Sequence, residues 1–396
     1  MSLSRVTSAF LHQAQPRRPL ARLPYNGQSF PTRPPNEAFK FQGGANPPAK
    51  PGMFKQAWHG FTYAIKRTGA FFNYLGSQIK TGAFLLMGVF AFMPLNAGLR
   101  NWVERMAIFP PAKIYDLPFK NADVLKSKIE THHFNMMDTL QGKLKGLTHE
   151  VRLDAKADKI QLRAWHIPAQ QSKPTVLFHQ QRSSNLSYLG PIMNVMRKKG
   201  YGIFVYDYPG YGKSEGKACE EAMYKAGLAA SQKLASLSKG AVPINQQIQM
   251  GYSLGTPVAS HVAYYQSLQG QKPKALVMVN SFPSLEKIIR YNLDHKFPWA
   301  KCLIGDKAIQ RINTRLNCER YLGKLNDVPT LFLQGENDSN APRSLVQAMS
   351  DGMPHKKSLN QVDSLPGVYH KLKDQDFETV GKHFFQFMEN RGLHRS

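Results

Sequence analysis

The chain has 396 residues, 42% of them hydrophobic, and a formal net charge of +26. This apolar content is typical of a globular protein with a full core, so a wholly disordered chain is excluded, and the length allows one large domain plus an appended segment. The three cysteines, Cys219, Cys302 and Cys318, form neither a disulfide framework nor paired metal-ligand spacing. The sequence therefore predicts a reducing compartment, no metal site and no other cofactor.

The first 110 residues carry the densest positive charge, with thirteen Lys and Arg against only Glu37 and Glu104. Anionic lipid at a membrane surface is the natural partner for such a segment. Nucleic acid is not expected as a partner, because no aromatic-basic binding motif or helix-turn-helix pattern is present. A basic composition without a dedicated partner is the alternative.

Residues 1–52 contain nine prolines and almost no acid, which predicts a disordered basic tail. Residues 53–107 then change character: aromatic and aliphatic side chains recur at helical spacing from Phe54 to Ile79, with basic residues mostly off that stripe. The nineteen uncharged residues 81–99 follow, and as a helix they would reach about 28 Å, just short of a bilayer core of about 30 Å. We expect 53–107 to be a membrane anchor, either spanning, re-entrant or interfacial; a helix packed on the following domain is the alternative.

After residue 110, short apolar runs alternate with helical stretches. Five runs fit buried parallel strands, at 175–179, 202–207, 244–250, 275–279 and 329–334, and residues 149–153 and 160–167 fit an antiparallel pair. Helices are expected over 220–237 and 374–389, among others. This alternation predicts an α/β domain whose site lies at the carboxyl ends of the strands.

The segment from Gly251 to Gly255 has the form of a nucleophile elbow, because Ser253 stands between two glycines directly after an apolar strand. A sharp strand-to-helix turn brings the neighbouring backbone close to both flanks of the serine, and glycine tolerates that crowding. The motif by itself also occurs in ordinary loops. The strand before it and the apolar helix expected after it favour the elbow.

Together with this elbow, the entry Ile108-Phe109-Pro110, the turn at His179 and the stretch from Asp207 to Gly216 resemble the α/β-hydrolase superfamily. The similarity is to its membrane-anchored, small-lid group, which includes protein depalmitoylases and lysophospholipases. The resemblance runs from about residue 108 to the C-terminus. It implies a catalytic domain over 108–396, with a mostly parallel sheet covered by helices on both faces and a lid over 281–327.

The resemblance also implies a catalytic triad in the order nucleophile, acid and base. Ser253 is the expected nucleophile, Asp338 the acid just past the last buried strand, and His370 the base. The other acids near the expected position are Glu336, Asp351 and Asp363, and the other histidine in the right interval is His355.

The loop after the first parallel strand departs from the family pattern. The backbone N–H groups of Leu254 and Gln181 are the expected oxyanion donors, and His179, Gln180 and Arg182 are expected to contact substrate. Gln180 stands where the family usually has glycine. We therefore expect a strained or displaced loop and slower catalysis.

Taken together, the pattern predicts a membrane-associated serine hydrolase that cleaves an acyl ester or thioester of a lipid or lipidated substrate. Two alternatives stay open. One is a non-catalytic α/β-hydrolase scaffold that binds lipid or protein, and the other is an aminopeptidase-like serine hydrolase.

Overall fold

The computed structural model describes residues 122–140, 158–296, 298, 309, 316–354 and 359–395. The tail predicted over 1–52 and the anchor predicted over 53–107 lie outside these residues. So does the strand expected at 149–153. In the described part of the chain, no helix combines the length and apolar character needed to cross a membrane.

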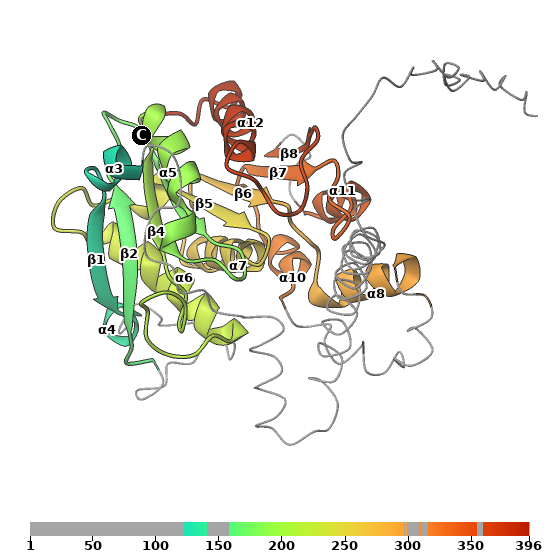
Figure 1. Cartoon of the computed structure of the whole chain (residues 1–396), viewed down its shortest axis with the longest axis horizontal. Helices are drawn as coiled ribbons and strands as arrows, with labels where there is room; N and C mark the ends of the chain where they lie inside the picture. Colours follow the sequence, from blue (N-terminus) through green and yellow to red (C-terminus); the bar gives the residue numbers. More distant parts are fainter. Residues whose placement is uncertain are drawn as a thin grey trace, which may run out of the picture. The chain divides into compact units, whose positions relative to one another are not determined.

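A single eight-stranded sheet forms the centre of the domain, in the order β1-β2-β4-β3-β5-β6-β7-β8 (Figure 1). Its strands are β1 (Glu130–Asn135), β2 (Gln161–Ile167), β3 (Thr175–His179), β4 (Gly202–Tyr206), β5 (Gln247–Tyr252), β6 (Ala275–Val279), β7 (Thr330–Gly335) and β8 (Asn360–Leu365). The six strands from β4 to β8 in this order run parallel, whereas β2 is antiparallel to both β1 and β4. The predicted mostly parallel α/β sheet is confirmed.

The burial of each strand explains the character of its sequence. Every residue of β3, β4, β5, β6 and β7 is buried. Burial on both faces is why β3, β4, β6 and β7 read as nearly continuous apolar runs, whereas β5 also contains the buried Gln247 and Gln249. The terminal strands β1 and β8 are partly exposed and carry polar side chains. Such polar edges discourage pairing with another chain.

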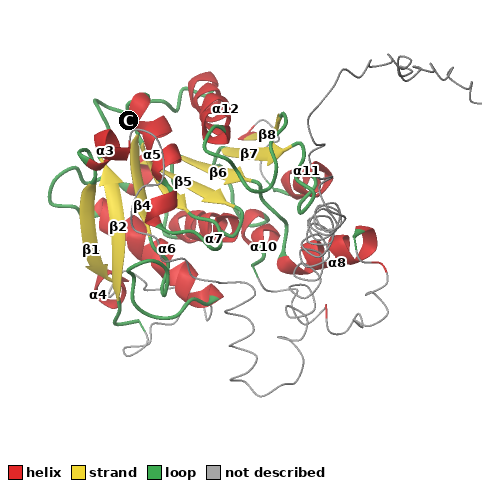
Figure 2. Ribbon diagram, in the orientation of Figure 1, coloured by secondary structure: helices red, strands yellow, loops and turns green. Residues whose placement is uncertain are grey.

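Helices cover both faces of the sheet (Figure 2). The longer ones are α5 (Gly190–Lys198), α6 (Glu220–Ala235), α7 (Gly255–Leu268), α8 (Leu285–His295), α11 (Arg343–Asp351) and α12 (Asp376–Asn390); shorter ones are α3 (Ala122–Lys126), α4 (Met136–Leu140) and α10 (Cys318–Leu322), with 3-10 turns at Leu186–Tyr188 and Ile244–Gln246. One apolar core holds side chains of α3, α5 and α12. Two others lie between the sheet and α4, α6, α7, α10 and α11.

The pairing expected between residues 160–167 and 149–153 is not tested, because 149–153 lie outside the described residues. In the described part of the chain, β2 pairs with β1 from Gln161 to His166 and with β4 from Ala164 to Ile167. The strand β1 was not predicted from the sequence. The polar sequence of β1, Glu-Thr-His-His-Phe-Asn, hid this strand because only Phe134 is buried in it.

Candidate functional site

Ser253 lies on a tight turn between β5, which ends at Tyr252, and α7, which begins at Gly255. Its φ angle is +50°, in the left-handed region that residues with a side chain rarely adopt. Holding a serine there costs about 1–3 kcal/mol. The Ser253 N–H donates to the Val279 carbonyl at 2.9 Å, and the Thr256 hydroxyl donates to the Ser253 carbonyl at 2.7 Å. These bonds to neighbouring elements hold the turn in its strained form.

The two glycines that flank the turn are required by close backbone approach. A Cβ at Gly251 would lie 2.5 Å from the carbonyl oxygen of Gly255, and a Cβ at Gly255 would overlap the carbonyl of His179. The start of α7 therefore packs directly against the end of β3. This contact places the loop after His179 beside the nucleophile turn.

The structure brings the three predicted triad residues together. Ser253 Oγ lies 2.9 Å from His370 Nε2, and His370 Nδ1 lies 2.8 Å from Asp338 Oδ2. The residues follow β5, β7 and β8, whose carboxyl ends meet at one edge of the sheet. The arrangement of the strands therefore brings the three side chains together.

Among the alternative acids, the structure places Asp363 against another histidine, with its Oδ2 2.8 Å from His383 Nδ1. Glu336 accepts from the backbone N–H of Gly367 at 3.4 Å, and Asp351 accepts from the side chain of Gln347. His355 lies outside the described residues. Asp338 is thus the carboxylate that reaches His370.

The Asp338 carboxylate is completely buried and fully hydrogen-bonded. Oδ1 accepts from the backbone N–H groups of Asn340 and Ala341 at 2.9 and 3.0 Å. Oδ2 accepts from Gln334 Nε2 at 2.8 Å, in addition to His370. Charge-assisted bonds of this kind offset the cost of burying a carboxylate and fix its orientation toward the imidazole.

Two residues that the sequence reading missed hold the His370 loop in place. Asn280, just after β6, donates from Nδ2 to the carbonyls of Tyr369 and His370, both at 2.9 Å, and its Oδ1 accepts from the Gly335 N–H at 2.8 Å. The Tyr252 hydroxyl donates to the His370 carbonyl at 2.9 Å and accepts from the Leu372 N–H at 2.8 Å. Position was the one signal that the sequence offered for these residues: Tyr252 is the last residue of β5, and Asn280 directly follows β6.

We predict that Asn280→Ala leaves the triad intact but misplaces its base. Because small displacements of a reacting group can cost about 100-fold in rate, we expect a 10- to 100-fold loss of kcat with little change in KM. Steady-state kinetics on the folded fraction measures this. Asn292→Ala is the control, since that buried amide bonds only the Ile288 carbonyl of its own helix. A kcat equal to that of this control would assign Asn280 a purely structural role.

Of the two expected oxyanion donors, Leu254 directly follows Ser253, and Gln181 lies in the loop after β3. In the described part of the chain, neither backbone N–H donates to a protein acceptor. Both groups remain open to an oxygen that is bound beside Ser253. The contact of Gly255 with the carbonyls of His179 and Gln180 brings the two segments side by side.

His179 does not have the expected substrate contact, because it belongs to the core. It is fully buried, its Nδ1 lies 2.7 Å from the Tyr206 hydroxyl, and its Nε2 lies 3.0 Å from Gln249 Oε1. Burial lowers the pKa of His179 to about 4, so the ring is neutral at pH 7. With both nitrogens engaged, it fastens β3 to β4 and β5.

Gln180 is likewise buried, and its Nε2 donates to the Tyr206 carbonyl at 3.0 Å, so its side chain points into the protein. The expected strain at this residue is wrong: among the described residues, the positive φ of this loop falls on Ser183, at +57°. The left-handed turn of this loop thus falls three residues after Gln180. Arg182 remains exposed on the loop surface.

The described part of the predicted lid, 281–327, contains α8 and α10. Lys287 of α8 pairs with Glu319 of α10 at 2.7 Å, which ties the two helices together. Just past α8, Lys296 Nζ lies 3.0 Å from Asn340 Oδ1, beside the loop that holds Asp338. This segment therefore reaches the edge of the sheet where the triad lies.

Comparison with known proteins agrees with this fold. A family profile described as the alpha/beta hydrolase fold matches residues 174–301. A solved alpha-beta hydrolase from Vibrio vulnificus superposes with a TM-score of 0.50 at 20% identity, over 67% of this chain and 82% of that one.

Sequence relatives include an uncharacterized membrane protein of Saccharomyces cerevisiae, 28% identical over 56% of this chain and 72% of that protein. Protein bem46 of Schizosaccharomyces pombe is 26% identical over 43% of this chain and 54% of its own length. Lysophosphatidylserine lipase ABHD12 of Danio rerio is 26% identical over 46% of this chain and 49% of its own length. The chain thus spans about half of the last two relatives. Its sheet order, its serine turn and the profile matched over residues 174–301 show that this chain has the α/β-hydrolase fold.

Proposed function

We propose that this protein is a serine hydrolase that cleaves an acyl ester or thioester through an acyl-enzyme. The observation that carries the proposal is the continuous chain from Ser253 Oγ through His370 to the buried Asp338 carboxylate, with contacts of 2.9 and 2.8 Å. A nucleophile, a base within hydrogen-bond reach and an orienting third group are what nucleophilic acyl transfer requires.

In the proposed reaction, His370 Nε2 takes the proton from Ser253 Oγ as the oxygen attacks the acyl carbon. Asp338 holds His370 in the tautomer that has its proton on Nδ1 and stabilises the imidazolium that forms. The N–H groups of Leu254 and Gln181 bind the oxyanion. His370 then protonates the leaving group, and a water molecule activated by the same nitrogen releases the acid.

We propose a lipid or another acylated molecule as the substrate class. The support is the similarity to a protein named lysophosphatidylserine lipase, together with the helical insert of 281–327 beside the triad. Arg182 is exposed on the loop next to the nucleophile turn, where a cation would favour an anionic head group.

Covalent labelling with a fluorophosphonate probe tests the proposal. The wild-type protein should become labelled at Ser253, because the probe reacts with a serine activated by a base. Ser253→Ala should stay unlabelled. A wild-type protein that also remains unlabelled while folded would favour the non-catalytic scaffold.

We further propose that the protein is attached to a membrane through residues 53–107. The support is the apolar and aromatic sequence of this segment, together with the similarity to a relative named as a membrane protein. Anionic lipid would complement the basic charge of the first 110 residues.

The attachment predicts a specific behaviour on fractionation. Because buried apolar surface is insensitive to salt whereas surface charge is screened, the full-length protein should stay in the membrane pellet at 1 M NaCl, an ionic strength with a Debye length of about 3 Å. A variant without residues 1–100 should move to the supernatant. Recovery of the full-length protein in the soluble fraction at low salt, without detergent, would contradict the anchor.

A further inference from the structure

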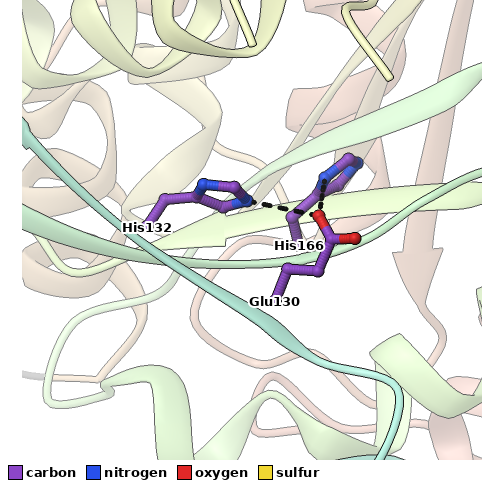
Figure 3. Close-up of side chains that lie close together, drawn as sticks. All are labelled: Glu130, His132 and His166. Carbon is purple, nitrogen blue, oxygen red and sulfur yellow. Dashed lines mark ion pairs between the residues drawn. The ribbon is translucent and has the colours of Figure 1, made fainter. Parts of the chain in front are cut away.

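Three side chains of types that can bind metal ions, Glu130, His132 and His166, lie close together on the β1–β2 pair (Figure 3). Glu130 and His132 are two positions apart on β1, so they point to the same face, and His166 lies directly opposite Glu130 on β2. Glu130 Oε2 is 3.5 Å from both His132 Nε2 and His166 Nδ1. One ligand atom of each residue lies within 4.8 Å of the others.

His166 is a buried polar group whose ring nitrogens lack hydrogen bonds, and its Nδ1 has only the 3.5 Å contact with Glu130 among the described residues. The residue is 1% exposed, and neither ring nitrogen forms a hydrogen bond in the described part of the chain. His132 Nε2 is also buried, and Glu130 Oε2 lies 3.5 Å from it without a hydrogen bond of normal geometry. Both rings pack on Phe204, with centroid distances of 6.0 and 5.7 Å. Buried polar atoms normally have partners, so these nitrogens are candidates for binding a ligand.

We propose that Glu130, His132 and His166 form a binding site for a divalent transition metal, with Zn²⁺ as the best match. Two imidazoles and one carboxylate are ligands that zinc accepts, and they leave a fourth position for water. Zinc bonds of about 2.0–2.2 Å in tetrahedral geometry place neighbouring ligand atoms about 3.3–3.5 Å apart. The two Glu130 contacts already have this spacing.

The position of the cluster indicates a structural role. Because β1 is the edge strand, the half-exposed Glu130 gives the ion access from solvent. Two sheet neighbours, β4 and β3, separate β2 from β5, so the cluster lies about 14 Å from β5 across the sheet. A bound ion would cross-link β1 to β2 and secure the edge of the sheet without touching Ser253.

The ligand set favours zinc over hard cations, because imidazole nitrogens are ligands that zinc accepts. A hard cation such as Mg²⁺ prefers a set of oxygen ligands, which two imidazoles do not supply.

Calorimetric titration of ZnCl₂ into the full-length, EDTA-treated protein tests the site. The wild-type protein should bind one ion per chain, and MgCl₂ should give no signal. Glu130→Gln and His132→Gln should each weaken zinc binding by about 100-fold or more, since even outer-shell partners of a metal are worth 10- to 100-fold. These two side chains are partly exposed, so their variants should fold even if a change at His166 does not.

The chain offers matched controls on the same strand and in the same assay. His133 is exposed, and its side chain projects from the opposite face of β1, so His133→Gln should bind zinc like the wild type. Cys219→Ser should do the same, which separates the site from an exposed thiol. Zinc should also slow amide hydrogen exchange of β1 in the wild type but not in Glu130→Gln.

Absence of zinc binding, unchanged affinity in Glu130→Gln and His132→Gln, or an equal loss in His133→Gln would each overturn the proposal. The test is independent of the hydrolase proposal. Zinc binding should be retained in Ser253→Ala, and fluorophosphonate labelling should be retained in Glu130→Gln.

Discussion

Ser253→Ala should lower the rate of acyl-ester hydrolysis by about 10⁴-fold or more, because the residues of a triad act as a unit and the rest cannot replace the nucleophile. Binding and the oxyanion donors alone should leave a residual rate above that of water. Hydrolysis of a short-chain chromogenic ester by the purified variant measures the effect. Alanine has a Cβ like serine, so it should be strained to the same extent at the φ of +50° that position 253 adopts. The variant should therefore fold like the wild type.

Ser260→Ala provides the matched control for this change. Ser260 is also a buried serine and lies in α7, the helix that follows Ser253. Its hydroxyl donates to the Pro257 carbonyl at 3.0 Å rather than to a histidine. Its activity should stay close to that of the wild type. Equal turnover by Ser253→Ala and Ser260→Ala would refute the assignment of the nucleophile.

His370→Ala should lose nearly as much activity as Ser253→Ala, and the double variant should lose no more than either single one. Asp338→Asn should cost about 10⁴-fold, because an amide in place of the carboxylate favours the wrong tautomer of the base. The amide would also present its N–H₂ to Gln334 Nε2 and His370 Nδ1, both of which now lie against Oδ2. Single-turnover kinetics separates these losses from changes in binding.

The pair formed by His383 and Asp363 is a control with the same chemistry, since its Nδ1–Oδ2 distance is also 2.8 Å. His383→Gln removes a histidine from a carboxylate without touching Ser253. Its rate should remain near that of the wild type. Activity that survives in His370→Ala but falls in His383→Gln would assign the base to the other histidine.

Much of this protein could be predicted from local sequence. The apolar runs of β3, β4, β6 and β7 indicated buried parallel strands, because a strand covered on both faces needs no polar residue. Gly251 and Gly255 indicated the turn at Ser253, since close backbone approach selects glycine there. Asp338 and His370 could be proposed because they follow two later strands, and parallel strands end at one edge.

Contacts between residues far apart in the sequence decide the features that local sequence did not predict, namely the pairing of β1 and the orientation of two loop side chains. Because β1 carries polar residues at an edge, its pairing with β2 is set by register rather than by hydrophobic pattern. His179 and Gln180 were expected to face substrate, but contacts with Tyr206, a residue of the neighbouring strand, turn both side chains into the core.

The sequence by itself determined the α/β class and the position of Ser253 on its turn, because both depend on residues close together along the chain. Only the tertiary structure decided which residues hold His370 and whether a cluster forms on β1 and β2. Asn280 reaches the His370 loop across ninety positions, and Glu130 meets His166 through strand register. Such contacts leave no local pattern, because chain folding, not sequence spacing, brings the partners together.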